Sequence, residues 1–384
     1  MAIRVQSGKA NIIKERCIDC GECIRVCPYH AKKAVTDELS LMEKFKYNIA
    51  LIAPALYGQF PKAEKVDVIL EAILKLGFDE TFDVAIGAQA VTQKTKELLN
   101  EGKLQLPAIS SACPAVMRLI AVRFPGLLKN LVPLRSPMEV SAQAARKLAV
   151  KKTGLEPHEI GVFFISPCPA KVTSVKASLT VDDSDVDGVL SMSEVCLKIA
   201  DFLGKTNKKV NAPKAGKLGI LWANSGGEAD ATETRWQISV DEIHNVIKVM
   251  EDIENNRLND IEFVEGLACS AGCVGGPLVV ENGFVARSRI KTMCEEMEEY
   301  GIDISDVAEI NWDKKPKRSK AMYLSEDIFE AMDMAQRMED IYERLPHLDC
   351  GSCGSPSCRD LAEDIVRGIA TEADCIFSGK NNKS

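Results

Sequence analysis

The stretch LPAISSACPAVMRLIAVRF, residues 106–124, contains the local pattern from which the fold can be predicted. A short apolar run, LPAI, leads into SSACPA, in which Cys113 stands between an alanine and a proline, and a segment with helical spacing follows. In open α/β folds, ligands gather in a crevice at the carboxyl ends of the strands. We therefore expect Cys113 to lie in a loop that faces such a crevice.

The same alternation continues along much of the chain from about residue 47. The expected strands are 47–55, 81–87, 106–110, 160–166, 217–223 and 260–266. The expected helices, which have apolar residues at helical spacing, include 62–77, 137–153 and 191–205. Strands that alternate with helices favour parallel sheets covered by helices, so the predicted fold class is α/β.

The ends of the chain differ from this middle part. Residues 1–46 are basic and rich in cysteine, and we expect a small ferredoxin-like segment there. The basic run DKKPKRSK at 313–320 is typical of a solvated linker, and 325–346 predicts an amphipathic helix with Ser325 as its N-cap. The predicted division is 1–46, 47–318 and 319–384, the last being a small helical cysteine-rich domain.

The composition indicates which kinds of partner and which cellular location to expect. The net charge is −8, with no basic stripe and 5% aromatic residues, so we expect no nucleic-acid partner. No apolar run reaches the roughly 18 residues of a membrane span, and the start lacks a secretory segment, so the expected location is the cytoplasm. Fourteen cysteines in reducing cytosol indicate metal ligands, and soft thiolates suit iron–sulfur clusters or zinc.

The first cysteine group has the spacing of a bacterial-ferredoxin [4Fe–4S] site. Its members, in CIDCGECIRVCP, are Cys17, Cys20, Cys23 and Cys27. In two-cluster ferredoxins the fourth cysteine of such a run binds the other cluster, and no second run is present here. The segment is then half of a two-cluster module, in which either Cys27 completes the cube or the cube is incomplete.

The last cysteine group follows the pattern CxxC-x4-C-x16-C, in a glycine-rich loop followed by a helical stretch. Its members are Cys350, Cys353, Cys358 and Cys375. The loop glycines allow the backbone to approach a cluster closely. The segment is similar to a small iron–sulfur domain appended to redox proteins, which implies a further [4Fe–4S] cluster. A zinc site, the alternative, commonly has two CxxC halves.

The four middle cysteines come from separate loops: Cys113, Cys168, Cys269 and Cys273. The first two follow expected strands, so one shared site is predicted. Buried structural thiols are the alternative, because free cysteine is often buried. That alternative suits Cys196 and Cys294, which lie on helical patterns, but it leaves the prolines and glycines around the other four unexplained.

Three of these loops, SACPA, SPCPAK and ACSAGCVGG, resemble the signature segments of the [FeFe]-hydrogenase catalytic domain, and IAPAL and SGGEA resemble its pocket segments. The resemblance spans roughly residues 47–300. It implies an H-cluster, in which the four middle cysteines hold a [4Fe–4S] cube and Cys273 bridges it to a diiron unit with CO, cyanide and a dithiolate. It also implies that Lys171 donates to one cyanide and that Ala53 and Pro54 line the other cyanide pocket. An ordinary surface lysine is the alternative for Lys171.

The sequence departs from catalytic members of that family along the proton path. Where those members carry a relay cysteine, this chain has Ala112, whose methyl group can neither give nor take a proton. The position of a relay serine aligns with Val132, the relay glutamates with Gln93 and Lys94, and the glutamate after the second motif with Ser174. Positioned acid–base groups contribute roughly 10²–10⁴-fold to a rate, so we expect slow turnover.

These departures resemble those of sensory-type [FeFe]-hydrogenases, which carry the same C-terminal cysteine pattern. The implied protein senses hydrogen: it binds and reversibly cleaves H2 at a low rate and passes the electrons through two further [4Fe–4S] clusters to an electron-transfer or signalling partner. An ordinary ferredoxin-linked hydrogenase with a proton path through Lys94 or water is one alternative. A non-catalytic iron–sulfur relative without the diiron unit is another. An oligomer is compatible with the sequence.

Overall fold

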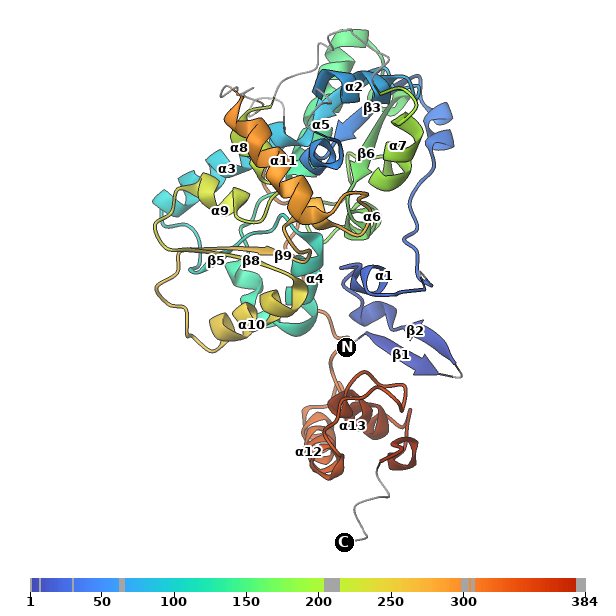
Figure 1. The fold of residues 1–384 in the computed structure, drawn as a ribbon. Coiled ribbons are helices and arrows are strands. Elements are labelled where there is room, and N and C mark those ends of the chain that lie inside the picture. Colours follow the sequence, from blue (N-terminus) through green and yellow to red (C-terminus); the bar gives the residue numbers. More distant parts are fainter. Residues whose placement is uncertain are drawn as a thin grey trace. The chain divides into compact units, whose positions relative to one another are not determined.

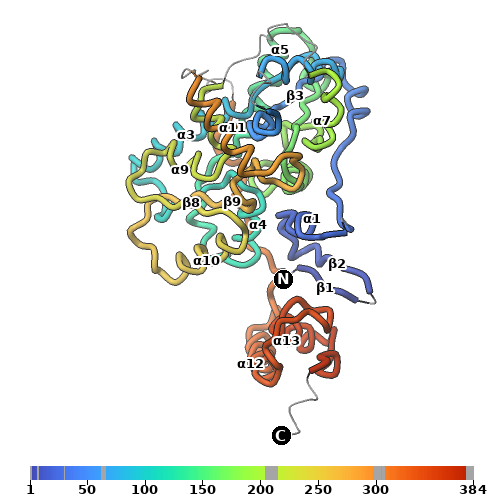
Figure 2. Tube along the Cα trace, in the orientation of Figure 1, coloured from blue at the N-terminus to red at the C-terminus, as the bar shows by residue number. Residues whose placement is uncertain are grey.

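The structure, a computed structural model, describes residues 2–6, 8–29, 31–61, 66–203, 215–297, 304 and 308–377. The chain forms two compact units, drawn in Figures 1 and 2. Residues 18–317 make the larger unit, and residues 1–17 group with 318–384 in the smaller one. This grouping differs from the division by sequence motifs, which remains a prediction, because compact units follow contacts whereas motifs follow the chain.

A four-stranded parallel sheet forms the centre of one half of the larger unit. Its order is β4 (Glu80–Asp83), β3 (Tyr47–Ile52), β6 (Ile160–Ser166) and β7 (Gly188–Ser191). β3 and β6 are almost wholly buried and apolar, as expected for strands covered on both faces. All four carboxyl ends therefore point toward the same edge of the sheet.

A second, three-stranded parallel sheet has the order β5 (Ala108–Ile109), β9 (Phe263–Leu267) and β8 (Gln237–Asp241). Figure 1 shows α9 on one side of this sheet and α10 on the other. The helices of this unit are α1 (Glu22–Arg25), α2 (Val66–Leu74), α3 (Val84–Asn100), α4 (Pro114–Arg123), α5 (Pro137–Thr153), α6 (Pro169–Lys176), α7 (Met192–Ile199), α8 (Lys217–Leu221), α9 (Gly227–Thr232), α10 (Ile243–Glu254) and α11 (Gly283–Glu295). The predicted class, parallel sheets flanked by helices, is confirmed.

Several expected elements were wrong in detail. The apolar run 217–223, expected as a strand, begins with helix α8, because a short apolar run does not distinguish a strand from a buried helix. The run 81–87 was also expected as a strand, but the strand β4 ends at Asp83 and helix α3 begins at Val84. The Asp83 carboxylate accepts a hydrogen bond from the N–H of Ala85 and so caps α3. β7 and β8 were not predicted.

The smaller unit combines the two ends of the chain. β1 (Ile3–Gln6) and β2 (Lys9–Ile12) form an antiparallel hairpin, and α12 (Ile328–Arg344) packs on α13 (Cys358–Val366). The expected helix in 325–346 is present, but its N-cap is Asp327 rather than Ser325, because the Asp327 carboxylate accepts from the N–H groups of Phe329 and Glu330. Within the described residues, no helix is long and apolar enough to cross a membrane.

Candidate iron–sulfur site

Two of the middle cysteines lie where a strand ends and a helix begins. Cys113 follows β5 and is the N-cap of α4, and Cys168 follows β6 and is the N-cap of α6. A proline occupies the first position of each helix, where its missing N–H is not needed. The Cys-Pro pairs in the sequence therefore mark strand-to-helix turns, as expected from the open α/β pattern.

The other two middle cysteines lie in the loop after β9. Ala271 and Gly272 have φ values of 64° and 98°, and Cys273 begins a short 3₁₀ turn. A Cβ on Gly272 would lie 2.5 Å from the backbone nitrogen of Ser225, so only glycine fits there without displacing the backbone. This close approach holds Cys273 against the loop that carries SGGEA.

The four thiols share one buried site. Burial raises the pKa of Cys168 to about 11 and that of Cys273 to about 12, and the charges of other thiols in the set raise them further. Burial also raises the pKa of Cys269 well above its ordinary value, as do the charges of Cys168 and Cys113. Cys269 is buried and the other three cysteines are partly buried. Four neighbouring thiols can stay deprotonated together only beside strong positive charge, which iron supplies. The donor set therefore fits an iron–sulfur cluster.

Lys171 lies in the first half of α6, half-buried beside these thiols. Its Nζ donates a hydrogen bond of 3.3 Å to the carbonyl oxygen of Ala112, and its charge lowers the pKa of Cys168 and Cys273. Ala53 and Pro54, both buried, follow the carboxyl end of β3, the strand that pairs with β6. These positions lie at the edge of the sheet that also carries Cys168.

The structure also describes the positions at which the sequence predicts substituted relay residues. Val132 is part of the apolar core. On α3, Gln93 and Lys94 both contact Glu97, and the Lys94–Glu97 ion pair of 2.9 Å lies at the surface. Ser174 lies in α6. Cys196 and Cys294, predicted to be structural thiols, are buried in α7 and α11.

A pair of buried carboxyl groups beside this site was not predicted from the sequence. Ser110 donates a 2.6 Å hydrogen bond to Glu228 and accepts one from the N–H of Ala112. Glu265, at 1% exposure, accepts hydrogen bonds from the N–H groups of Gly226 and Ala229. Burial raises the pKa of Glu228 to about 8, helped by the charge of Glu265, and burial raises the pKa of Glu265 to about 7. The two titrate as a pair that keeps a proton at neutral pH.

A signal for this pair was present in the sequence. Glu265 interrupts the apolar pattern of the predicted strand DIEFVEG, and a charged residue in a fully buried strand needs a functional or structural reason. A further polar group lies nearby: the side-chain oxygen and nitrogen of Asn224 are buried with no hydrogen-bond partner among the described residues. Asn224 pairs through its backbone with Gly272, so this amide adjoins the Cys273 loop.

The cysteines of the first group fall on the two compact units, with Cys17 in the smaller and the other three in the larger. Burial raises the pKa of Cys20, whereas a hydrogen bond from the backbone of Glu22 lowers it. The N–H of Ala31 donates to the sulfur of Cys27 at 3.4 Å. Such N–H···S contacts are typical around cluster ligands and tune their potentials.

The last four cysteines, by contrast, come together within the smaller unit. Cys350, Cys353, Cys358 and Cys375 all line one small cavity. Cys358 opens α13, and its N–H donates to the carboxylate of Asp349 at 2.7 Å. In the described part of the chain, no three Cys, His, Asp or Glu side chains are close enough to hold a single metal ion.

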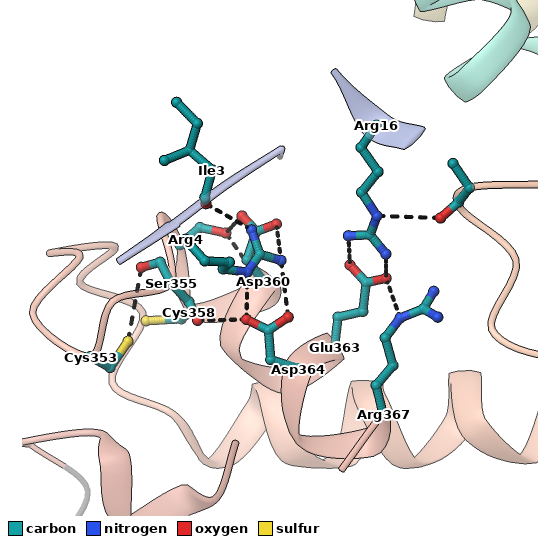
Figure 3. Close-up of polar contacts among 12 residues, drawn as sticks. Ile3, Arg4, Arg16, Cys353, Ser355, Cys358, Asp360, Glu363, Asp364 and Arg367 are labelled. Atoms are coloured by element: carbon teal, nitrogen blue, oxygen red, sulfur yellow. Dashed lines mark hydrogen bonds and ion pairs between the residues drawn. The ribbon is translucent and has the colours of Figure 1, made fainter. Parts of the chain in front are cut away.

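Buried ion pairs fasten the N-terminal hairpin to this cysteine loop (Figure 3). Arg4 pairs with Asp364 at 2.5 Å and with Asp360 at 3.3 Å. Asp364 also accepts a 2.7 Å hydrogen bond from Ser355, whose carbonyl contacts the sulfur of Cys353. A second group joins Arg16 and Arg367 to Glu363. The cysteine loop therefore depends on residues from the other end of the chain.

The fold and the three sets of thiols define an iron–sulfur protein of the α/β type. The family model described as "Iron only hydrogenase large subunit, C-terminal domain" matches residues 46–233 and 224–277. The chain belongs to this family. A 4Fe-4S binding domain model matches residues 10–33, and an Fe-S cluster model matches residues 345–377.

Known relatives agree with this assignment. The NADP-reducing hydrogenase subunit HndD of Solidesulfovibrio fructosivorans is 22% identical over 339 residues, which are 72% of this chain and 58% of that protein. The chain thus spans less than two thirds of that relative's length. A variant of [FeFe]-hydrogenase HydA1 from Chlamydomonas reinhardtii is similar in structure, with a TM-score of 0.54, 15% identity, and 71% of this chain and 97% of that chain covered. A structure describing oxygen inactivation of an [FeFe]-hydrogenase matches with a TM-score of 0.56, at 16% identity and with the same coverage. At these identities the likeness shows the fold.

Proposed function

We propose that this chain is a hydrogen-sensing [FeFe]-hydrogenase, which binds and reversibly cleaves H2 at a low rate and passes electrons through [4Fe–4S] clusters to a signalling partner. The observation that carries the proposal is the side chain next to Cys113. Ala112 presents a methyl group where the family's catalytic members carry a proton-relay cysteine. We place the protein in the cytoplasm, where free thiols persist.

In this proposal Cys113, Cys168, Cys269 and Cys273 hold the cube of an H-cluster, and Cys273 also bridges to its diiron unit. When bound, that unit supplies a metal site for H2 and an amine that exchanges its proton. Lys171 provides a compact positive charge for a cyanide ligand, since a charge-assisted hydrogen bond is strong in a dry pocket. Ala53 and Pro54 exclude water on the β3 side.

The other two cysteine groups would conduct electrons. We assign one [4Fe–4S] cluster to Cys17, Cys20, Cys23 and Cys27 and another to Cys350, Cys353, Cys358 and Cys375. The three functional segments are then 1–46, 47–318 and 319–384. The four middle cysteines, Cys113, Cys168, Cys269 and Cys273, form the central site. The segment 319–384 would report the redox state of this site to the partner.

Protons must still reach the central site for any turnover. Ala112 cannot carry them, and Lys94 is held in a surface ion pair. Glu228 and Glu265 are buried groups that keep an exchangeable proton, and Glu228 connects to the backbone of Ala112 through Ser110. This pair is the observation that favours the second candidate, an ordinary ferredoxin-linked hydrogenase with a rerouted proton path.

Restoring the missing thiol distinguishes these candidates. For a sensor limited by Ala112, Ala112→Cys should raise H2 evolution on the order of 10²-fold at unchanged iron content. Ala112→Ser, which adds a hydroxyl of similar size but far weaker acidity, should gain much less. Equal rates for wild type and Ala112→Cys would contradict the sensor proposal and support the rerouted path. An infrared spectrum without CO and cyanide bands would instead support a non-catalytic relative.

A further inference from the structure

Two cysteine-bearing loops of the larger unit pack directly against each other. Gly21, between Cys20 and Cys23, has a φ of +72°. A Cβ at Gly21 would lie 2.2 Å from Cγ of Pro277, in the loop that follows Cys273. Only glycine allows this approach, so the segment between Cys20 and Cys23 is held against the loop that follows Cys273.

Arg25 spans the same contact. It is the last residue of α1, and its Nη1 donates to the carbonyl oxygen of Gly275 at 3.4 Å. Its guanidinium also pairs with Glu22 one turn earlier. The side chain is 24% exposed, so its charge is only partly screened by water.

The charge of Arg25 lies beside both cysteine groups. Arg25 is two residues after Cys23, in the first group, and its guanidinium donates to the carbonyl oxygen of Gly275, two residues after Cys273 in the central site. Lys171 lies three residues after Cys168 and donates to the carbonyl oxygen of Ala112, next to Cys113. Cations therefore act on the central site from two elements, α6 and α1, and the cation on α1 is shared with the first cysteine group.

We propose that Arg25 is a positioning residue that joins the first cluster to the central cluster and raises the reduction potentials of both. The inference rests on the proposed function, because it requires clusters at both sites. Reduction adds one negative charge to a cluster, and a fixed positive charge nearby stabilises the reduced form. The guanidinium stays charged at every working pH, so the effect does not depend on its titration.

Glu22 opposes this effect. Its carboxylate lies two residues after Cys20 and pairs with Arg25, so its negative charge offsets the positive charge of the guanidinium. Removing Arg25 leaves a negative charge beside the clusters, whereas removing Glu22 leaves a positive one. The two neutral variants should therefore shift the potentials in opposite directions, which a loss of packing alone would not do.

The test is a redox titration of the anaerobically reconstituted full chain, followed by electron paramagnetic resonance. In Arg25→Gln, the ratio of reduced to oxidised cluster at a fixed potential should fall about tenfold at both sites, a shift of about 59 mV for a one-electron couple. In Glu22→Gln it should rise. Arg25→Lys, which keeps the charge, should stay near wild type. Arg123→Gln removes a charge from an exposed pair with Glu251 and should leave both potentials unchanged.

Unchanged potentials in Arg25→Gln with both cluster signals intact would overturn the inference, while the proposed function would stand. Shifts in the same direction for Arg25→Gln and Glu22→Gln would overturn it as well, since they indicate a structural effect. If Arg25→Gln loses its iron, the other two variants decide. The inference then requires potentials near wild type in Arg25→Lys and higher potentials in Glu22→Gln. A wild-type chain without a central cluster signal would refute the proposed function itself.

Discussion

Ser110 donates a 2.6 Å hydrogen bond to Glu228, and the two side chains are 1% and 4% exposed. Ser110 lies directly after β5, in the stretch that also carries Ala112 and Cys113. This bond connects the loop of the central site to a carboxyl group that burial keeps protonated near neutral pH. The protein therefore has a proton store beside Ala112.

If this store supplies the site, Glu228→Gln should lower H2 evolution on the order of 10²-fold, because the amide has nearly the same shape but no exchangeable acid proton. Specific activity at constant iron content is the measurement. Glu251→Gln, on the exposed face of α10, is the matched control and should retain full activity. A wild-type rate in Glu228→Gln would exclude the carboxyl pair from the path.

The same pair should make stability depend on pH. Burial raises the pKa of Glu228 above that of the unfolded chain, so the native state binds more protons between the two values. Its contribution to stability is therefore lost as the pH rises through the window that ends at about 8. The free energy of unfolding of wild type should fall relative to Glu228→Gln, by at most about 1.4 kcal/mol per pH unit. The free energies of unfolding of wild type and Glu228→Gln are measured by chemical denaturation from pH 5 to 9. Parallel pH dependences for the two proteins would contradict the raised pKa of Glu228.

Arg4→Met should destabilise the smaller unit. The change leaves the carboxylates of Asp360 and Asp364 buried without their guanidinium, and breaking a buried ion pair costs about 3–5 kcal/mol. Asp364 also positions Ser355 beside Cys353, so part of the iron bound by 350–375 should be lost too. Thermal unfolding and an iron count measure the two effects. Arg344→Met, which removes an exposed pair with Glu372, should change neither.

Gly272→Ala should disturb the central site specifically. The residue needs a positive φ, and an added Cβ would lie 2.5 Å from the nitrogen of Ser225 and 2.7 Å from the oxygen of Ala223. The loop must shift, and Cys273 is the next residue. We expect the signal of the central cluster to be lost from the electron paramagnetic resonance spectrum, while the signals of the other two clusters are retained. Gly102→Ala is the control, since it combines a positive φ with open space.

The sequence was informative wherever local chemistry determines structure. Cys113 and Cys168 were expected after strands because each follows a short apolar run, and that is where they lie. The helix over 137–153 was predicted from the helical spacing of its apolar residues and has the observed bounds, with Ser136 and Gly154 as its caps. The prediction of a strand over 217–223 was wrong because short apolar segments suit a strand or a buried helix equally.

The remaining features depend on contacts between distant segments. Glu228 and Glu265 become an acid pair only when α9 packs on β9. The charged residue in the apolar run 260–266 therefore pointed to Glu265 but not to its partner. The pairing of Arg4 with Asp364 joins the two ends of the chain, and the motif-based division assigned these residues to different segments. Arg25 lay in a recognised cysteine motif, but its contact with Gly275 is tertiary.

We propose that Cys113, Cys168, Cys269 and Cys273 hold a cube joined to a diiron unit beside Lys171. Infrared spectroscopy of the anaerobically matured protein is the decisive measurement, with Lys171→Met as the companion variant. We expect CO and cyanide bands in wild type, and cyanide bands that shift or disappear in the variant. A fully iron-loaded wild-type protein with no such bands would contradict it.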